Sequence, residues 1–301
     1  MKVRVLGSAA GGGFPQWNCA CGNCRAARAG DSHVRPRTQD SIAVSSGGAD
    51  GHAWVVLNAS PEIRAQIESF EGLHPRAARD TPIAALVLTN GDLDHTLGLF
   101  SLRESHPITV VSTAAVRSGI LEANVMVRTL QRFDGQLTWH ALALGAELVV
   151  AGLRIELFPV EGKRPVHLER VGDASPEDNV GVLATDGAGK RVAYVPGVAS
   201  LDAASRAKIE GADVVLFDGT FWSADELSKP GLMNKRAEDM AHWPLGGEDG
   251  SLQALAKLRA GRKIYTHINN TNPILRDDSP ERRAVEAAGV EVAYDGLTIE
   301  V

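Results

Sequence analysis

Residues 84–99 read AALVLTNGDLDHTLGL, an apolar run that ends in two carboxylates and an imidazole. The apolar start predicts a buried strand, and Asp92, Asp94 and His95 follow its end. Carboxylates and imidazoles are common metal ligands and common general acids and bases. An isolated Asp-x-Asp-His pattern also occurs in capped turns. Taken alone, the stretch leaves a metal site, an acid–base site and a structural turn open.

Two later apolar runs also end in side chains that can bind metal. VVLFDGTFW, residues 214–222, places Asp218 at the end of one run, and KIYTHINNTNP, residues 263–273, places His267 at the end of another. Side chains at the carboxyl ends of strands point into the crevice where α/β proteins carry their chemistry. Together with residues 92–95, these positions predict one convergent metal or catalytic site.

NCACGNC, residues 18–24, holds every cysteine of the chain: Cys19, Cys21 and Cys24. The C-x-C-x2-C spacing lets one tight loop bring three thiolates around one ion, and an odd, clustered set is a poor disulfide framework. Free buried thiols are the alternative, but the Gly, Asn and Arg neighbours are not typical of a core. We predict a structural Zn²⁺ site whose fourth ligand comes from elsewhere in the chain.

The composition is that of a soluble globular protein. The chain has 301 residues, of which 44% are hydrophobic and 23% charged, and its net charge is −6. This charge gives no basic field for nucleic acid or an anionic membrane, and the apolar runs are much shorter than the ~20 residues of a membrane span. Residues 1–15 show a short strand-like run and then glycines rather than a signal peptide, so we expect a cytoplasmic protein.

Short apolar runs bounded by Gly, Pro, Asn or Asp predict strands that interleave with helices. The expected strands cover residues 2–6, 41–44, 54–58, 84–89, 108–112, 147–150, 154–159, 180–185, 191–195, 214–218, 263–267 and 291–293. The expected helices cover residues 60–70, 96–104, 114–121, 201–209, 250–258 and 281–287, and a turn is expected at 48–51. Tight turns between sequential strands argue against a purely parallel sheet. We therefore predict an α/β sandwich that forms a single domain, residues 1–301.

Five stretches together resemble the metallo-β-lactamase superfamily, and in particular its phosphodiesterase-like branch. They are VLGSAAGGGFPQWNCACGNC, LVLTNGDLDHTLGL, FDGTFW, HWPLGGEDGS and THINNTNP. Across nearly all the chain, the sequence is similar to one family of this superfamily, which takes part in pyrroloquinoline quinone (PQQ) biosynthesis. The resemblance implies a four-layer αββα sandwich of metallo-β-lactamase type.

The superfamily motif His-x-His-x-Asp-His is only partly kept. Asn90 and Asp92 stand where its first two histidines are expected, whereas Asp94, His95 and the terminal His267 match. A two-zinc hydrolase needs both metal sites to clamp and activate its water, so these changes disfavour a β-lactamase or a binuclear phosphodiesterase. Two imidazoles and a carboxylate with open positions suit non-haem Fe²⁺, which we predict at Asp94, His95 and His267.

The resemblance gives roles to three more residues. Asp92 and Asp218 are expected as additional carboxylates at the iron or directly behind it. Asp218 is expected to replace the superfamily's bridging aspartate, which residues 195–197 do not supply. His242 is expected to transfer protons, because the related branch places a mobile catalytic histidine there.

Other residues are given less weight. His167 lies where the superfamily's third histidine usually occurs, but its VHLER context favours an exposed surface residue. Asn270 could lie near the zinc loop, although asparagine is a poor zinc ligand. Residues 11–13, three glycines, are expected to let the backbone pass close to the metal cleft rather than to bind phosphate.

The resemblance, together with the changes in the superfamily motif, leaves three functions open. The first is an Fe²⁺- and O₂-dependent hydroxylase that acts on the tyrosine ring of a Glu–Tyr precursor derived from the PqqA peptide. The second is a non-enzymatic carrier of PQQ or its precursor, and the third is a metallohydrolase with a degenerate first metal site. The resemblance implies a PQQ precursor and other PQQ biosynthesis proteins as partners, and it is compatible with a homodimer.

Overall fold

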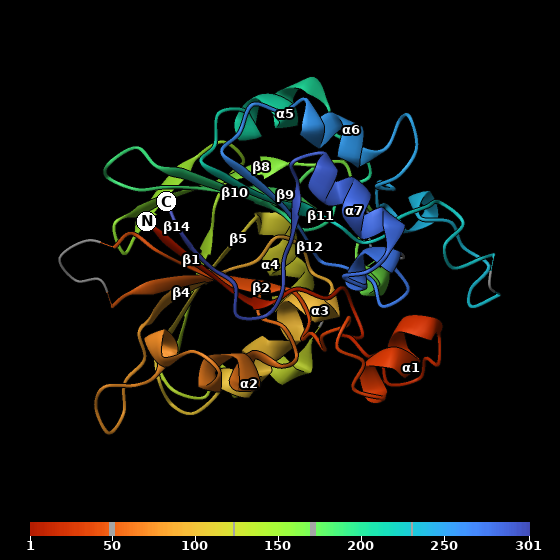
Figure 1. Cartoon of the computed structure of the whole chain (residues 1–301). Coiled ribbons are helices and arrows are strands. Elements are labelled where there is room, and N and C mark those ends of the chain that lie inside the picture. The colour runs from red at the N-terminus through yellow and green to blue at the C-terminus, as the bar shows by residue number, and fades with distance from the viewer. Residues whose placement is uncertain (48–51, 123, 169–172, 230) are drawn as a thin grey trace.

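Two mixed β-sheets form the centre of the molecule, and helices cover the outer face of each (Figure 1). The computed structural model describes residues 1–47, 52–122, 124–168, 173–229 and 231–301. The turn expected at 48–51 lies outside the described residues. Within the described part of the chain, no helix is both long and apolar enough to span a membrane.

The first sheet has seven strands in the order β14-β1-β2-β3-β4-β5-β6. Their bounds are β1 Lys2–Gly7, β2 Ser41–Ser45, β3 Trp54–Leu57, β4 Ile83–Val87, β5 Ile108–Ser112, β6 Leu137–Ala141 and β14 Thr298–Glu300. β1, β2 and β3 pair antiparallel, whereas β3, β4, β5 and β6 run parallel. The parallel strands bring the end of β4, which carries residues 89–95, to one edge of the sandwich.

The second sheet has seven strands in the order β13-β12-β11-β10-β9-β8-β7. Their bounds are β7 Glu147–Val150, β8 Leu153–Pro159, β9 Val180–Thr185, β10 Arg191–Val195, β11 Val214–Asp218, β12 Arg262–Thr266 and β13 Glu291–Val292. β11 lies parallel between β10 and β12, and Asp218 pairs with Thr266 in register. This pairing places Asp218 beside the start of the loop that carries His267.

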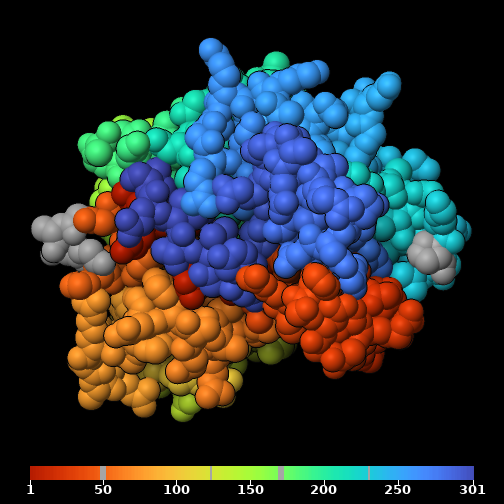
Figure 2. All heavy atoms as spheres, viewed as in Figure 1, coloured from red at the N-terminus to blue at the C-terminus, as the bar shows by residue number. Residues whose placement is uncertain are grey.

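Helices fill the two outer layers. They are α1 Gly22–Arg28, α2 Ile63–Glu68, α3 Leu93–Thr96, α4 Ala114–Leu121, α5 Ala203–Ile209, α6 Ser251–Ala256 and α7 Pro280–Ala287. The 3₁₀ segments are η1 Glu71–Leu73, η2 Leu97–Leu102, η3 Val125–Thr129, η4 Val166–Leu168, η5 Glu238–Met240 and η6 Pro273–Leu275. In the space-filling view the N-terminal segment with α1 packs beside the C-terminal part of the chain, where Val34 and Arg276 form an isolated β-bridge (Figure 2).

Buried apolar residues form three layers of core. The central layer joins the inner faces of the two sheets and includes Val5, Leu57 and Leu216. A second layer packs α2, η2 and α4 on the first sheet, and a third packs α1, α5, α6 and α7 on the second sheet. This is the predicted four-layer αββα sandwich.

Besides short 3₁₀ segments, two strands and one α-helix of the described residues were not expected from the sequence. β6 alternates partly buried and exposed residues at a sheet edge, and β14 is only three residues long. α1 begins inside the cysteine motif, where Cys21 accepts a bond from the Cys24 amide as N-cap. The helix expected over 96–104 instead starts at Leu93 and continues as 3₁₀ helix, because Gly98 packs directly on the backbone of residues 59–60.

Candidate metal centres

A cavity of about 530 Å³ opens where the end of β4 faces the ends of β11 and β12. Its lining brings together several of the predicted residues, namely Asp92, Asp94, His95, His242 and His267. Asp218 is fully buried behind this lining. The cavity therefore collects side chains from segments more than 170 residues apart in the chain.

Asp94, His95 and His267 form one group of possible metal donors in the cavity. Their ligand atoms all lie within 4.8 Å of one another. Asp94 Oδ2 lies 3.1 Å from His267 Nε2 and 3.7 Å from His95 Nε2. Asp94 and His95 lie on α3, directly after β4, and His267 follows β12 with a left-handed backbone (φ 54°) that non-glycine residues rarely adopt.

Two threonines orient the histidines of this group. His95 Nδ1 lies 3.1 Å from Thr89 Oγ1, which donates its own hydrogen to Asn58 Oδ1. His267 Nδ1 lies 2.8 Å from Thr220 Oγ1, which donates to Asp218 Oδ1. Each hydroxyl can then only accept from its histidine, so both rings carry hydrogen on Nδ1 and turn Nε2 toward Asp94.

The support behind His95 continues into the core. Asn58 donates through Nδ2 to the Tyr194 hydroxyl at 3.2 Å, and the Thr89 amide donates to Asn58 Oδ1 at 3.0 Å. The Tyr194 hydroxyl donates to Asp40, which also accepts from Thr266. Because these groups are almost completely buried, the network fixes the orientation of Thr89 and therefore of His95.

The pKa shifts of Asp94, His95 and His267 show that the negative charge of Asp94 attracts a cation to this group. Burial opposes charge on His267, but the hydrogen bond and charge of Asp94 raise its pKa to about 9. Burial lowers the pKa of His95 to about 4 despite the attraction of Asp94. Burial favours the neutral form of Asp94, yet the two histidines hold its pKa well below the usual range. The charge of Asp94 thus keeps a proton on His267, and a metal ion bound to the group would replace that proton.

His95 Nε2 gives the direct test of whether a cation fits. His95 is 2% exposed, and its Nε2 has no hydrogen-bond partner among the described residues. An unpaired buried nitrogen is costly unless something binds it. A divalent ion between the two Nε2 atoms and Asp94 would satisfy it, and two imidazoles with one carboxylate are suitable ligands for Fe²⁺.

Asp218 and His242 form a hydrogen-bonded pair beside this group. His242 Nδ1 lies 2.7 Å from Asp218 Oδ2, and the His242 ring stacks on His267 at 5.4 Å between centroids. Asp218 also accepts from the amides of Val198 and Thr220, each at 3.0 Å, and from the Thr220 hydroxyl. Burial opposes its charge, but the charge and hydrogen bond of His242 lower the pKa of Asp218.

The carboxylate oxygens of Asp218 therefore accept hydrogen bonds from other groups of the chain. Asp218, His242 and His267 also qualify by distance as a second group of metal donors. However, four accepted hydrogen bonds leave the Asp218 carboxylate little capacity for a metal ion. The pair leaves His242 Nε2 as the nitrogen that is free to exchange protons.

The other predicted residues lie at the rim. Asp92 lines the cavity but belongs to neither donor group, and burial together with the charge of Asp94 raises its pKa. Asn90 accepts from the Asp92 amide through Oδ1 at 3.0 Å and so closes the turn. His167 is exposed, as expected, and nevertheless lines the cavity. A Cβ on Gly11 would lie 3.3 Å from Asp94 Oδ2, which confirms the close approach of the glycine loop.

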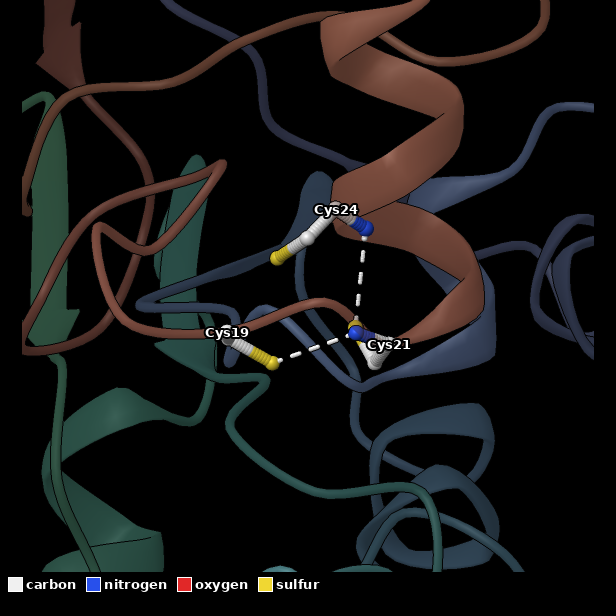
Figure 3. A group of neighbouring side chains, drawn as sticks. All are labelled: Cys19, Cys21 and Cys24. Atoms are coloured by element: carbon white, nitrogen blue, oxygen red, sulfur yellow. Dashed lines mark hydrogen bonds between the residues drawn. The ribbon is translucent and has the colours of Figure 1, made fainter.

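The three cysteines form a second centre at the start of α1. Cys19 and Cys21 lie on the loop before the helix and Cys24 on its first turn (Figure 3). Their sulfur atoms lie within 4.8 Å of one another, and burial raises the pKa of Cys21 to about 11. Thiolates about 2.3 Å from one Zn²⁺ ion would be about 4 Å apart, so the spacing fits zinc.

Asn270 completes this second centre. Its Nδ2 lies 3.1, 3.3 and 3.6 Å from the sulfurs of Cys19, Cys24 and Cys21, respectively. The amide is therefore the fourth polar group around the thiols, and it faces them with its Nδ2 hydrogen-bond donor.

Several residues that shape the site were missed from the sequence. Thr89 is the last residue of one predicted strand and Thr220 lies two positions after another, so hydroxyls next to strand-end donors could have indicated them. Asn58, Tyr194 and Asp40 gave no such indication, because their contacts join strands of different sheets. Lys163, which lines the cavity, lies in a loop without a motif.

Comparisons with known proteins identify the family and the fold of the chain. A family model described as β-lactamase superfamily domain matches residues 53–268. Coenzyme PQQ synthesis protein B from Methylorubrum extorquens strain PA1 is 46% identical over 306 residues, which span 100% of each chain. The crystal structure of Zn²⁺-bound PqqB from Methylobacterium extorquens is 45% identical, covers 100% of each chain and has a TM-score of 0.93. A diphosphatase of the PhnP family shares the fold, with a TM-score of 0.68, 21% identity and coverage of 100% of this chain and 97% of that chain.

Proposed function

Because the chain belongs to the coenzyme PQQ synthesis protein B family, within the β-lactamase superfamily, we propose that it is a hydroxylase of PQQ biosynthesis. Its fold is the metallo-β-lactamase fold. In this proposal Asp94, His95 and His267 hold Fe²⁺, and the substrate is the tyrosine ring of a Glu–Tyr precursor. The observation that carries it is the buried Nε2 of His95, which has no hydrogen-bond partner in the part of the chain that the structure describes and which faces a carboxylate and a second imidazole.

The reaction consumes external reactants. Each new hydroxyl group requires one O₂, two electrons from an external reductant and two protons from solvent, and one oxygen atom leaves as water. Fe²⁺ held by Asp94, His95 and His267 would supply the activation of O₂. The protein contributes the orientation of the three ligands through Thr89 and Thr220.

The pair of Asp218 and His242 handles the protons. Asp218 holds His242 through Nδ1, which leaves Nε2 to accept the phenolic hydrogen of the substrate and return it later. The buried charge of Asp218 stabilises the protonated imidazole that forms in between. Asp92, at the rim, adds a carboxylate that can bind the substrate's amino group.

The rim fits an aromatic carboxylate. Leu93 and Val166, which are 63% and 65% exposed, line the same cavity, so two large apolar side chains lie where a ring would enter. Lys163 is the only lysine or arginine among the cavity-lining residues that the structure describes. We assign it to a carboxylate of the precursor, because an ammonium group pairs with a carboxylate in a partly desolvated cavity.

The cysteine centre has a separate, structural role in this proposal. Cys19, Cys21 and Cys24 with Asn270 hold Zn²⁺, the ion present in the related PqqB crystal structure. The protein is proposed to work in the cytoplasm with other PQQ biosynthesis proteins, and a homodimer is compatible with this role.

Anaerobic reconstitution with Fe²⁺ tests the proposal. On addition of O₂, a reductant and Glu–Tyr, mass spectrometry should detect a gain of one or two oxygen atoms. The gain should depend on iron and be lost in His267→Ala and Asp94→Ala. Lys163→Met should weaken binding of Glu–Tyr about tenfold or more, with binding measured under nitrogen so that turnover does not contribute.

Other outcomes separate the competing functions. Saturable binding of PQQ or Glu–Tyr without any mass change would favour a carrier. Iron-independent hydrolysis of a phosphodiester or lactam, abolished by the same two variants, would favour a metallohydrolase. Either result would overturn the hydroxylase.

A further inference from the structure

The two donor centres share one short segment of the chain. After β12 ends at Thr266, residues 267–272 run from the cavity to the cysteine loop. His267 contributes Nε2 to the cavity group, and Asn270 places its amide among the three cysteine sulfurs. Two centres that the sequence presents as unrelated motifs are thus only three residues apart along the backbone.

Hydrogen bonds clamp this 267–272 segment to the helix that carries Cys24. Asn23, on α1, donates through Nδ2 to the carbonyls of Asn270 and Asn272 at 3.2 and 2.9 Å. Asn272 in turn donates through Nδ2 to the carbonyls of Gly219 and Thr220 at 2.9 and 3.3 Å. Thr220 is the residue that orients His267, so a continuous path joins the cysteine helix to the cavity.

The members of this path are buried. Asn23 is 8% exposed, Asn270 is 4% and Asn272 is 0%. Releasing any one of them would leave unpaired amide and carbonyl groups without water, which is costly. The path therefore connects α1 to the 267–272 segment through buried, hydrogen-bonded side chains.

His267 needs such external support. Its left-handed backbone (φ 54°) is unfavourable for a residue with a Cβ, so neighbouring contacts must hold it. The Ile268 amide donates to the Ser8 carbonyl at 2.9 Å and the Asn269 amide donates to the Thr220 carbonyl at 3.1 Å. Ser8 lies on the loop that leads to the glycine turn at residues 11–13, and Thr220 lies on the loop that follows β11.

We infer that the cysteine centre positions His267, so that a cation bound by Cys19, Cys21 and Cys24 raises the metal affinity of the cavity group. When the cation is absent, α1 is held against Asn270 by hydrogen bonds, namely those of the Asn23 side chain and those between the Asn270 amide and the cysteine thiols. When it is present, the loop, α1 and Asn270 are fixed to one another, and the path through Asn23 and Asn272 fixes Thr220 and His267. The two centres then fill in order, with the cysteine centre first.

This inference rests on the proposed metal ligands of the cavity, and its test does not depend on turnover. Metal-free protein is titrated with Co²⁺, whose visible absorption reports the cavity group, once as the wild type with Cd²⁺ bound to the thiols and once as a Cys19→Ser, Cys21→Ser, Cys24→Ser variant, whose cysteine centre cannot take up Co²⁺. Prior filling with Cd²⁺ should tighten the Kd for Co²⁺ about tenfold or more, the range expected when the supporting contacts of a metal ligand are improved. Linkage requires the cavity metal to tighten Cd²⁺ binding by the same factor.

A variant tests the path itself. Asn23→Ala removes both clamps but no metal ligand, so the cysteine centre should still bind one Cd²⁺ while the tightening of Co²⁺ is lost. Asn18→Ala is the matched control, because Asn18 is exposed on the same loop and bonds only to Gln16 among the described residues. If Asn23→Ala does not fold, the titrations of the wild type and the cysteine variant decide.

The failures can be told apart. A wild-type protein that binds both metals with independent affinities would overturn the inference and leave the proposed function standing. A wild-type protein that binds metal only at the cysteine centre would contradict both.

Discussion

Two threonine hydroxyls orient the histidines of the cavity by the same device. Each hydroxyl accepts a hydrogen bond from histidine Nδ1 and donates its own hydrogen to an oxygen with a fixed position. Thr89 donates to Asn58 Oδ1, and Thr220 donates to Asp218 Oδ1. A hydroxyl that can only accept selects one imidazole tautomer. The metal affinity of the cavity therefore depends on residues that never touch the metal.

Thr89→Val tests this dependence. Valine matches threonine in shape but cannot accept from His95 Nδ1, so we expect the Kd for Fe²⁺ or Co²⁺ in the cavity to rise about 10- to 100-fold. Equilibrium dialysis with the cysteine centre kept full measures it. Thr138→Val, on an exposed strand position, is the control and should leave the Kd unchanged. An unchanged Kd in Thr89→Val would mean that the tautomer is set in another way.

For single residues, the sequence predicts the side chains that can bind metal better than it predicts the residues that orient them. Asp94, His95 and His267 are visible because each follows an apolar run that ends abruptly. Their supports are not visible, since Asn58 and Tyr194 belong to different sheets and look like ordinary strand residues. Asp218 is visible as a strand-end carboxylate, but its hydrogen bonds, which favour a positioning role, can only be seen in three dimensions.

Among the elements, the segment of α3 and η2 shows how packing overrides a local pattern. Apolar spacing predicts one helix over 96–104, whereas the chain forms one short α turn and then 3₁₀ helix. The Gly98 amide donates to the Ala59 carbonyl at 2.9 Å, and this close approach leaves no room for a side chain. The tight packing keeps Asp94 and His95 directed at the cavity.

Gly98→Ala should therefore destabilise the protein. An added Cβ would lie 2.1 Å from the Ser60 carbonyl oxygen and 2.8 Å from that of Ala59, so backbone must move. We expect a loss of about 1–3 kcal/mol in the free energy of unfolding, measured by urea denaturation. Gly187→Ala is the matched control, because a Cβ there meets nothing within 4 Å and should change stability by less than about 0.5 kcal/mol. Equal stabilities of the two variants would show that the loop can shift freely.

In the whole molecule, the layers follow from patterns that the sequence displays openly. Apolar runs of strand length, separated by helix patterns and turns, predict two sheets with helices outside, and the three layers of core match this. The sheet order could not be predicted from local pattern, because β1 and β14 pair across almost the entire chain. The edge strands β6 and β14 were missed, since edges need little apolar surface.

Glu226 makes the stability of the whole molecule depend on pH. It accepts hydrogen bonds from the Trp222 amide and from Thr271, next to the cysteine centre. Burial raises its pKa to about 7, against 4.5 for the ordinary side chain. The folded protein then binds more protons than the unfolded chain between these values. Stability from this group is complete below about pH 4.5 and is lost as the pH rises through about 7.

Glu226→Gln should remove most of this dependence, because the amide has no charge to bury. A shift of this size corresponds to at most about 3 kcal/mol, so the free energy of unfolding should fall less between pH 5 and pH 8 in the variant than in the wild type. Urea titrations at both values measure the difference. Glu248→Gln, at an exposed carboxylate, should follow the wild-type curve. Parallel wild-type and Glu226→Gln curves would mean that Glu226 stays ionised in the folded protein. The hydrogen bonds to its carboxylate would then offset the effect of burial on its pKa.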